Sequence, residues 1–550
     1  MSGAKFASSY DYIICGGGTS GCVVAARLSE DPSFSVLLLE AGISDHDLPA
    51  TEVPSVGDSL QGTDIDWKFK CEPQENAYKG YQDVDCSKAK ILGGGSTHNN
   101  MEFTRCAAAD YDEWAQLGCT EWGWKDVLPY YMKSENWNCS EVDRDVHQTG
   151  GPMTVSRPHQ SADHNLTLSK AFVKAGCDLG YKEIDACSGD ILGFGDFPAN
   201  IDSDGKRSST SRAYIHPAEN RPNLKVLCKA YVTKIDIKEC KAVGVYFVLE
   251  GEKHHISANR EVIVAGGPIS SPQLLMLSGI GPKKHLEEIG IGCIADLPVG
   301  KNLQDHLGIV MKVAVKPGSG VWKPETLPVD VNCTTSVGFV KVNAEDDNPF
   351  PDIQFIFLNL LPYGPDARNL RKPYQHIDYN TTREGFTVLP TLLKPKSVGE
   401  IKLVNSDPFC HPIIDPHYLE HDYDVKTMVK GIRLAKQMIE SDAFKSYECQ
   451  LREWNLPDSP YDPWSEDHLT ECVRHFAYTG YHPVGTCKMG ASDDPSAVVD
   501  PKLRVRGIEC LRVVDSSIMP VVPSGNTNAP SVMIGEKGAN IIKTTIPSMV

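Results

Sequence analysis

The chain has 550 residues, of which 41% are hydrophobic and 23% charged. This composition supports a sizeable core and argues against a disordered protein, and the length predicts several structural units or a few large ones. Its 54 basic and 72 acidic residues give a net charge of −18. An acidic chain without a basic run is a poor candidate for binding nucleic acid or an anionic membrane surface. No stretch approaches the roughly 18 apolar residues of a membrane span.

Cysteine usage and glycosylation triplets bear on the compartment and on metals. The 18 cysteines are too dilute for a disulfide scaffold, and no CxxC pair or zinc-type Cys/His spacing occurs, so we expect no metal site. The first ten residues lack the apolar segment of a signal peptide, so either a leader has been removed or the protein is cytosolic. We favour a secreted protein because of the many cysteines and four N-x-[ST] triplets, at Asn138, Asn165, Asn332 and Asn380.

The first 42 residues predict a βαβ unit. A short apolar run at 11–15 enters a glycine cluster, residues 22–30 carry apolar residues at helical spacing, and 35–42 form a second buried strand. Further strands of the same type appear far downstream, at 261–267 and 511–517, the last followed by a helix near 531–542. The pieces of one nucleotide-binding sheet are therefore scattered along the chain.

The glycine cluster has the spacing of a dinucleotide site. Gly16, Gly18 and Gly21 fit G-x-G-x-x-G, in which the glycines allow a tight turn, a close approach to the pyrophosphate and close packing of helix on strand. The helix N-terminus then directs free N–H groups at the phosphates. Glu40 ends the next strand, where an acidic side chain accepts from ribose hydroxyls. The motif predicts a dinucleotide and does not separate FAD from NAD.

Strand-like alternation of apolar and polar residues fills the middle of the chain. It predicts a second, mostly antiparallel domain inserted between parts of the first. The segments that show it are 312–317, 336–342, 353–358 and 399–406.

Long motifs in several blocks resemble those of the glucose–methanol–choline (GMC) flavoprotein oxidoreductases. Residues 90–106 (KILGGGSTHNNMEFTRC) and 266–281 (GGPISSPQLLMLSGIG) resemble the two family signatures, and 297–306 (LPVGKNLQDH) resembles an arthropod form of a further motif. Three C-terminal blocks complete the set in family order, at 481–490, 498–520 and 525–540.

The resemblance covers nearly the whole chain and implies an α/β fold. This fold has a discontinuous Rossmann-like FAD domain and a substrate domain with a six-stranded antiparallel sheet. We expect the FAD domain in 1–150, 205–310 and 478–550, and the substrate domain in 151–204 and 311–477.

The resemblance also implies the cofactor contacts. Glu40 should bind the adenosine ribose, Val232 should meet the adenine through its backbone, and Asp515 with the Pro530–Ser531 turn should lie against the isoalloxazine. Gly95 stands where serine is commoner and would leave room near the ring. The other expected FAD contacts are Gly16, Gly18, Thr19, Ser20, Gly21, Ala41, Leu92, Gly94, Ser96, His98, Asn99 and Tyr481.

Two residues match the family's reacting pair. His482 corresponds to the catalytic histidine and Asn528 to its partner. Alcohol oxidation removes a hydroxyl proton and a hydride from one carbon, and imidazole is a base suited to neutral pH. The cofactor takes the hydride, while Asn528 can bind the same hydroxyl oxygen. We interpret His475, seven residues earlier, as structural.

His98 departs from the usual first signature, which has an aliphatic residue at that position. Some relatives carry histidine there, bonded covalently to the flavin 8α-methyl carbon. A buried histidine hydrogen-bonded to backbone is the alternative. We favour the covalent link.

The sequence predicts an FAD-dependent oxidase of a small alcohol, which gives a carbonyl compound and hydrogen peroxide. The alternatives are a dehydrogenase of glucose or another alcohol with a quinone-type acceptor, a hydroxynitrile lyase, and a relative such as a mandelonitrile oxidase. A non-catalytic binding protein is the least favoured, since both reacting positions are intact. The sequence does not indicate an oligomeric state. Aromatic residues of the inserted region favour an aromatic or benzylic substrate; they include Trp322, Phe339, Phe355, Phe357, Tyr363 and Trp464.

Overall fold

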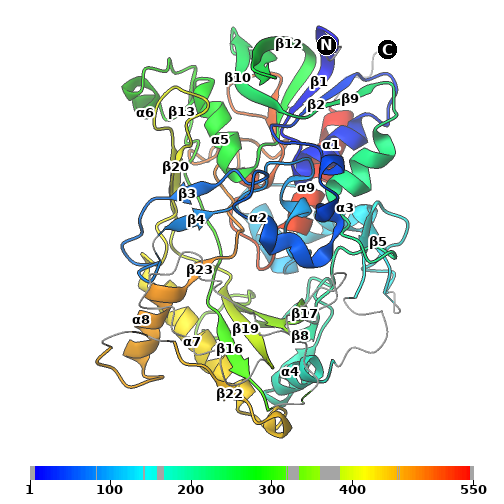
Figure 1. Ribbon diagram of the computed structural model, residues 1–550. Helices are drawn as coiled ribbons and strands as arrows, with labels where there is room; N and C mark the ends of the chain where they lie inside the picture. Colours follow the sequence, from blue (N-terminus) through cyan, green and yellow to red (C-terminus); the bar gives the residue numbers. More distant parts are fainter. Residues whose placement is uncertain are drawn as a thin grey trace.

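The computed structural model describes residues 6–81, 83–139, 143–157, 166–316, 319, 334–359, 384–454, 456 and 459–545. Two large sheets occupy opposite ends of the molecule, with both chain ends beside the first sheet (Figure 1). The mixed α/β fold expected from the sequence is confirmed.

The first sheet gathers strands from distant parts of the chain. Its parallel centre is β9 (Leu224–Leu227), β2 (Val36–Leu39), β1 (Ser9–Cys15), β12 (Glu252–Val264) and β24 (Leu511–Val513). β10 (Ala230–Lys238) and β11 (Lys241–Leu249) add an antiparallel edge on the N-terminal half of β12. The predicted strands at 261–267 and 511–517 are therefore confirmed as neighbours in this sheet.

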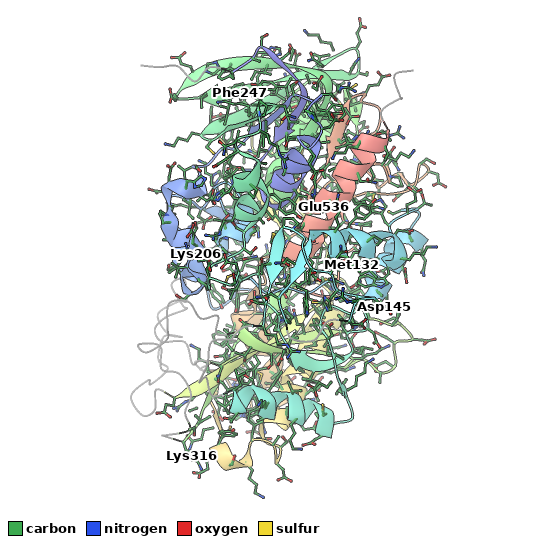
Figure 2. The ribbon with its side chains drawn as sticks, turned by 90° about the vertical axis from the view of Figure 1, so that its right-hand side faces the viewer. Met132, Asp145, Lys206, Phe247, Lys316 and Glu536 are labelled. Atoms are coloured by element: carbon green, nitrogen blue, oxygen red, sulfur yellow. The ribbon has the colours of Figure 1, made fainter. Side chains whose placement is uncertain are left out.

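Helices pack against this sheet because its strands are apolar on both faces. All four residues of β2 are buried, as expected of a central parallel strand. Helix α1 (Thr19–Leu28) packs against α9 (Asn528–Thr544). Glu536, labelled in Figure 2, is fully buried on α9. It accepts from Nε and Nη2 of Arg27 of α1 at 2.7–2.9 Å and from the Tyr214 hydroxyl, so its charge is paired.

The turn between β1 and α1 requires glycine at two positions. Gly16 has a φ of +113°, a conformation that side-chain-bearing residues rarely adopt. A Cβ added at Gly21 would lie 1.9 Å from the carbonyl oxygen of Gly16. The first and third glycines of the motif are therefore fixed by backbone packing alone.

The second sheet differs from the expected six antiparallel strands. In the described part of the chain it has nine strands, all paired antiparallel except β7 (Lys182–Glu183) with β8 (Gly193–Asp196). Four of the nine are two-residue strands at its margins, which the sequence pattern is too short to reveal. The five longer strands are β8, β16 (Met311–Ala314), β17 (Thr334–Val340), β18 (Ile353–Leu358) and β19 (Gly385–Leu392).

Helices flank the second sheet. α7 (Asp422–Ile439) packs against β19 and α4 (Thr167–Asp178) against β17, while α8 (Glu466–Phe476) packs on α7. The predicted segment 399–406 instead forms β20 (Glu400–Lys402), which pairs with β21 (Ile413–Asp415) in a separate small sheet.

Two short strands join the second sheet close to the predicted domain borders. β15 (Leu307–Gly308) and β23 (Tyr478–Thr479) pair with each other, and β15 also pairs with β19. Both strands fall in segments assigned above to the FAD domain. The domain borders themselves stay predictions.

The structure also bears on the cysteines, on metal sites, on membrane spans and on the glycosylation triplets. The cysteines that the structure describes are free thiols, and these residues contain no cluster of side chains suited to a metal ion. No helix of the described ranges is long and apolar enough to cross a bilayer. Asn138 is exposed just after β5 (Glu135–Trp137), whereas Asn165, Asn332 and Asn380 lie outside the described residues.

Candidate active site

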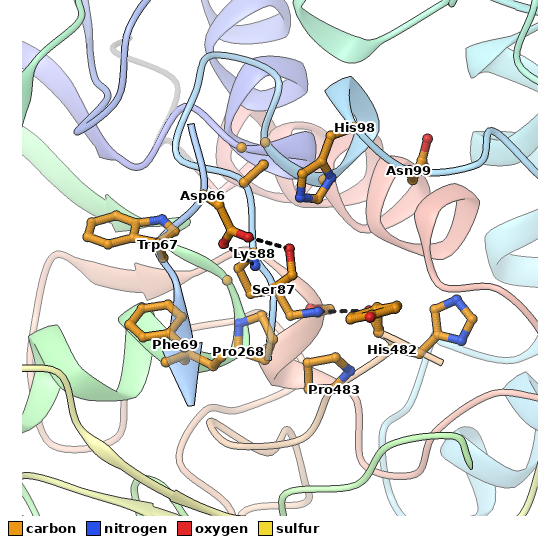
Figure 3. A pocket seen from close by; sticks show the side chains of 18 of the residues that line it. Asp66, Trp67, Phe69, Ser87, Lys88, His98, Asn99, Pro268, His482 and Pro483 are labelled. Carbon is orange, nitrogen blue, oxygen red and sulfur yellow. Dashed lines mark hydrogen bonds between the residues drawn. The ribbon is translucent and has the colours of Figure 1, made fainter. Parts of the chain in front are cut away.

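A cavity of about 990 Å³ is lined by residues of both large sheets. Figure 3 shows some of its lining side chains. The cavity brings together most of the site residues predicted from the sequence. Those that line it are Gly16, Gly18, Thr19, Ser20, Glu40, Ala41, Gly94, His98, Asn99, Val232, Tyr481, His482, Asp515, Asn528 and Ser531. Gly21, Leu92, Ser96 and Pro530 are not among the lining residues; Ser96, for instance, is buried and donates to the Gly93 carbonyl at 2.6 Å.

The glycine turn leaves space where a bound group would lie. Gly18 is the N-cap of α1, and a Cβ added to it would meet only the Ala265 carbonyl oxygen, at 3.8 Å. A Cβ at Gly95 would meet nothing within 4 Å. Both glycines line the cavity, so their missing side chains fit a ligand that approaches the backbone closely.

Glu40 stands at the end of β2 with its carboxylate fixed by the backbone. One oxygen accepts from the N–H of Gly17 at 2.8 Å and the other from Gly42 at 2.7 Å. Burial raises the pKa of Glu40, against the lowering effect of these hydrogen bonds. Each oxygen keeps a lone pair for a ribose hydroxyl, the role predicted for this residue.

His98 projects into the cavity without hydrogen bonds (Figure 3). Its side chain is buried, and neither ring nitrogen has a hydrogen-bond partner. Burial lowers its pKa to about 4, so the imidazole is neutral. Buried polar atoms without partners are rare, and two on one ring facing a cavity fit a group bound beside them.

Asp515 and the start of α9 form the facing wall. The Asp515 carboxylate accepts from the backbone N–H groups of Gly267 and Ser517 and from the Ser271 hydroxyl, at 2.6–2.9 Å. Asn528 is the first residue of α9, and its Nδ2 donates to Asn200 Oδ1 at 3.2 Å. This bond fixes the amide and leaves its other hydrogen free to donate into the cavity.

His482 is held from two sides. Its backbone N–H donates to Asp305 Oδ1 at 2.8 Å, and the other oxygen of Asp305 accepts from the Thr479 hydroxyl at 2.6 Å. Its ring contacts the buried His306, with 3.1 Å between the two Nδ1 atoms. Burial lowers the pKa of His482 well below 6.5, and His306 and the Lys88 charge lower it further. The imidazole is therefore neutral near neutral pH and can accept a proton.

Lys88 restrains the residue before the histidine. Its Nζ donates to the Tyr481 carbonyl at 2.8 Å (Figure 3). Tyr481 has a φ of +60°, an uncommon conformation for a residue with a side chain. Strain of this kind persists where the surroundings enforce it, and it recurs at active sites.

Sequence reasoning missed Lys88, Asp305 and His306 as site residues. Asp305 and His306 belong to the 297–306 block used for the resemblance, and Lys88 stands just before the 90–106 block. Only the fold shows that they reach residues 479–482.

The aromatic residues of the inserted region that the structure describes do not line the cavity. Phe339, Phe355 and Phe357 are fully buried and do not line the cavity, and Trp464 packs beside Trp454. Trp322 and Tyr363 lie outside the described residues. The side chains that the second sheet and its margin contribute are mainly aliphatic or threonine: Val310, Ile356, Leu358, Thr387, Leu389 and Thr391.

A cavity with a glycine turn for a pyrophosphate, an acidic group for a ribose and a neutral histidine defines a dinucleotide-dependent oxidoreductase. Comparison with known proteins places the chain within that class. Residues 10–308 and 395–535 match the two models of the GMC oxidoreductase family. The chain belongs to this family.

Similar proteins span nearly the whole chain. An oxygen-dependent choline dehydrogenase of Chromohalobacter salexigens is 35% identical and covers 98% of this chain and 96% of its own length. An FAD- and quinone-dependent glucose dehydrogenase of Drosophila pseudoobscura pseudoobscura is 36% identical, over 97% of this chain and 87% of its own. The crystal structure of a pyridoxine 4-oxidase from Mesorbium loti matches with a TM-score of 0.85 at 27% identity, covering 98% of this chain and all of its own.

The protein is thus an FAD-binding oxidoreductase that acts on alcohol-type donors. The site fits the cofactor, because Gly18, Gly95 and the unpartnered His98 present space and free polar atoms along one cavity. Glu40, Val232 and Asp515 would hold its parts as predicted.

The Lys88 charge predicts a pH effect on flavin reduction. The rate should fall as the pH drops through the pKa of His482, because only the neutral imidazole accepts a proton, and this acid limb should lie below pH 6.5. Lys88→Met removes a charge that lowers this pKa, so the limb should move to higher pH in anaerobic stopped-flow measurements. The control is Lys90→Met, which removes the charge of a lysine that lies over the Trp67 ring. It should leave the pH of the acid limb unchanged. An unmoved limb in Lys88→Met would contradict this electrostatic account.

Proposed function

We propose that the protein oxidises a small apolar alcohol, aromatic or benzylic, to the carbonyl compound, with dioxygen as the acceptor and hydrogen peroxide as the second product. The observation that carries the proposal is a neutral His482 that shares one cavity with Asn528. The second sheet and its margin line that cavity mainly with aliphatic and threonine side chains, and the aliphatic ones suit an apolar donor.

His482 acts as the base in this proposal. Asp305 and His306 hold its backbone and ring, so the side chain that receives the hydroxyl proton is already oriented. Asn528, fixed by Asn200, donates its remaining amide hydrogen to the same hydroxyl oxygen. When bound, FAD supplies the hydride acceptor. The protonated imidazole left by this transfer favours the negative charge that dioxygen acquires on reduction.

The choice of substrate rests on the cavity wall. Val310, Ile356 and Leu389 offer no hydrogen bonds to the many hydroxyls of a sugar. Glu102 also reaches the cavity, and its carboxylate accepts from the Thr334 hydroxyl at 3.0 Å. This carboxylate could favour a cation such as choline, while the aliphatic wall disfavours glucose; both compounds are named for relatives. They are therefore the compounds to compare with benzyl alcohol.

The test is anaerobic mixing of the holoenzyme with benzyl alcohol, choline, glucose and mandelonitrile in turn, followed by air. The flavin absorbance should bleach fastest with benzyl alcohol and recover quickly in air, with one equivalent of hydrogen peroxide. Bleaching with slow recovery would identify a dehydrogenase that needs another acceptor. No bleaching by any alcohol, together with cleavage of mandelonitrile, would indicate a lyase.

We also propose that His98 is bonded covalently to the flavin 8α-methyl carbon. Its two unpartnered ring nitrogens and its low pKa of about 4 support a neutral nucleophile facing the cofactor site. The bond forms with loss of one proton from the methyl group, one proton from the ring nitrogen and two electrons, and dioxygen takes up all four to become hydrogen peroxide.

Acid precipitation tests this bond. Wild-type flavin should stay with the denatured protein, and His98→Ala should release all of it into the supernatant. His468→Ala changes a buried histidine of α8 and should behave as wild type. Free flavin in the wild-type supernatant would rule out the bond.

Secretion stays a proposal supported by the sequence. Asn138 itself is exposed, as the acceptor of a glycosylation site must be. A mass decrease after glycosidase treatment of the native protein would support it.

A further inference from the structure

We propose that His306 is a positioning residue, which holds His482 in the tautomer whose Nε2 is free to take the alcohol proton. This inference rests on the proposed role of His482 as the base. It is drawn from the contacts of the two rings.

The first step is the tautomer of His306. Its side chain is fully buried, and its Nε2 lies 3.1 Å from the carbonyl oxygen of Leu393. A carbonyl oxygen can only accept, so Nε2 carries the hydrogen of this bond. Burial lowers the pKa of His306 to about 3, so the ring holds a single hydrogen and its Nδ1 has a free lone pair.

The second step is that the tautomer of His306 determines the tautomer of His482. The two Nδ1 atoms are 3.1 Å apart, and the rings meet edge to face at 82°. Since His306 Nδ1 can only accept, His482 Nδ1 must donate. A neutral His482 has one hydrogen to give, so its Nε2 is left as the acceptor, on a residue that lines the cavity.

The packing keeps the two rings in direct contact. Gly480 donates its N–H to the His306 carbonyl at 2.7 Å. A Cβ at this glycine would lie 3.2 Å from His482 Nδ1 and 3.3 Å from His306 Cβ. The absence of a side chain at residue 480 therefore leaves the space in which the rings meet.

The surrounding charges disfavour a second proton on either ring. The cations of Lys88 and Lys394 act on His482 and His306 respectively, and the carboxylate of Asp305 is occupied by hydrogen bonds, including the one from the His482 backbone. Lys394 is itself paired with Asp110 and Glu113. The pair formed by His306 and His482 therefore consists of two neutral imidazoles.

Two substitutions separate positioning from packing. His306→Leu fills the space but offers no acceptor, whereas His306→Asn keeps an oxygen near the place of Nδ1. In anaerobic stopped flow with saturating alcohol, flavin reduction should slow by about 10- to 100-fold in His306→Leu, as for other partners that orient a working histidine. His306→Asn should stay within about threefold of the wild-type rate. The control His468→Leu should reduce the flavin at the wild-type rate. Equal losses in Leu and Asn variants would overturn the proposal.

A double-mutant cycle tests whether His306 acts through His482. In the His482→Ala background, His306→Leu should cause no further loss, because the residue it orients is gone. A full additional loss in the double variant would show an independent role and overturn the proposal. FAD content and the thermal midpoint of each variant identify any that fail to fold, and His306→Asn then carries the comparison with wild type.

A readout without alcohol distinguishes this inference from the proposed function. Diethylpyrocarbonate acylates unprotonated imidazole nitrogens, and mass spectrometry of the peptide with His482 follows its rate in the holoenzyme. The rate should be equal in wild type and His306→Asn and several-fold slower in His306→Leu. Identical rates in all three would overturn the inference. If no alcohol reduces the flavin but this pattern holds, the proposed function fails and the positioning role stands.

Discussion

The buried carboxylate of Asp305 is the contact on which the site depends. Only 4% of this residue is exposed, and its two oxygens accept from the His482 backbone, the Thr479 hydroxyl and the Tyr418 hydroxyl at 2.6–2.8 Å. An unpaired carboxylate in such a place would be costly, and these bonds offset that cost. They connect the segment before β15 to Thr479 of β23, to His482 just after that strand, and to Tyr418 after β21.

Several features of the active site follow from this connection. β15 and β23 pair beside it, so His482 follows directly after a strand at the margin of the second sheet, in the cavity that the glycine turn of the first sheet also lines. Burial of the same region lowers the pKa of His482 and raises that of Asp305. One desolvated environment therefore keeps the His482 imidazole neutral, and the hydrogen bonds within it keep the residue oriented.

The sequence predicted the elements whose signals are local. The glycine turn, Glu40 at the end of β2 and the parallel strands are encoded in short patterns, and the structure places them together. Asp305 and His306 were not predicted because His482, which both contact, lies about 175 residues away, and no local pattern reports such contacts. Whether the aromatic residues of the inserted region line the cavity depends on which face of a strand they occupy. Along β18 the side chains alternate, so Ile356 and Leu358 face the cavity while Phe355 and Phe357 enter the core.

The central claim is that a neutral imidazole at position 482 removes the hydroxyl proton. Its most direct test is anaerobic flavin reduction by His482→Ala, with and without added imidazole, beside His475→Ala as the matched control. The rate should fall by about 10²- to 10⁴-fold with FAD retained, recover in part with imidazole, and stay unchanged in the control. Reduction at the wild-type rate in His482→Ala would contradict the account.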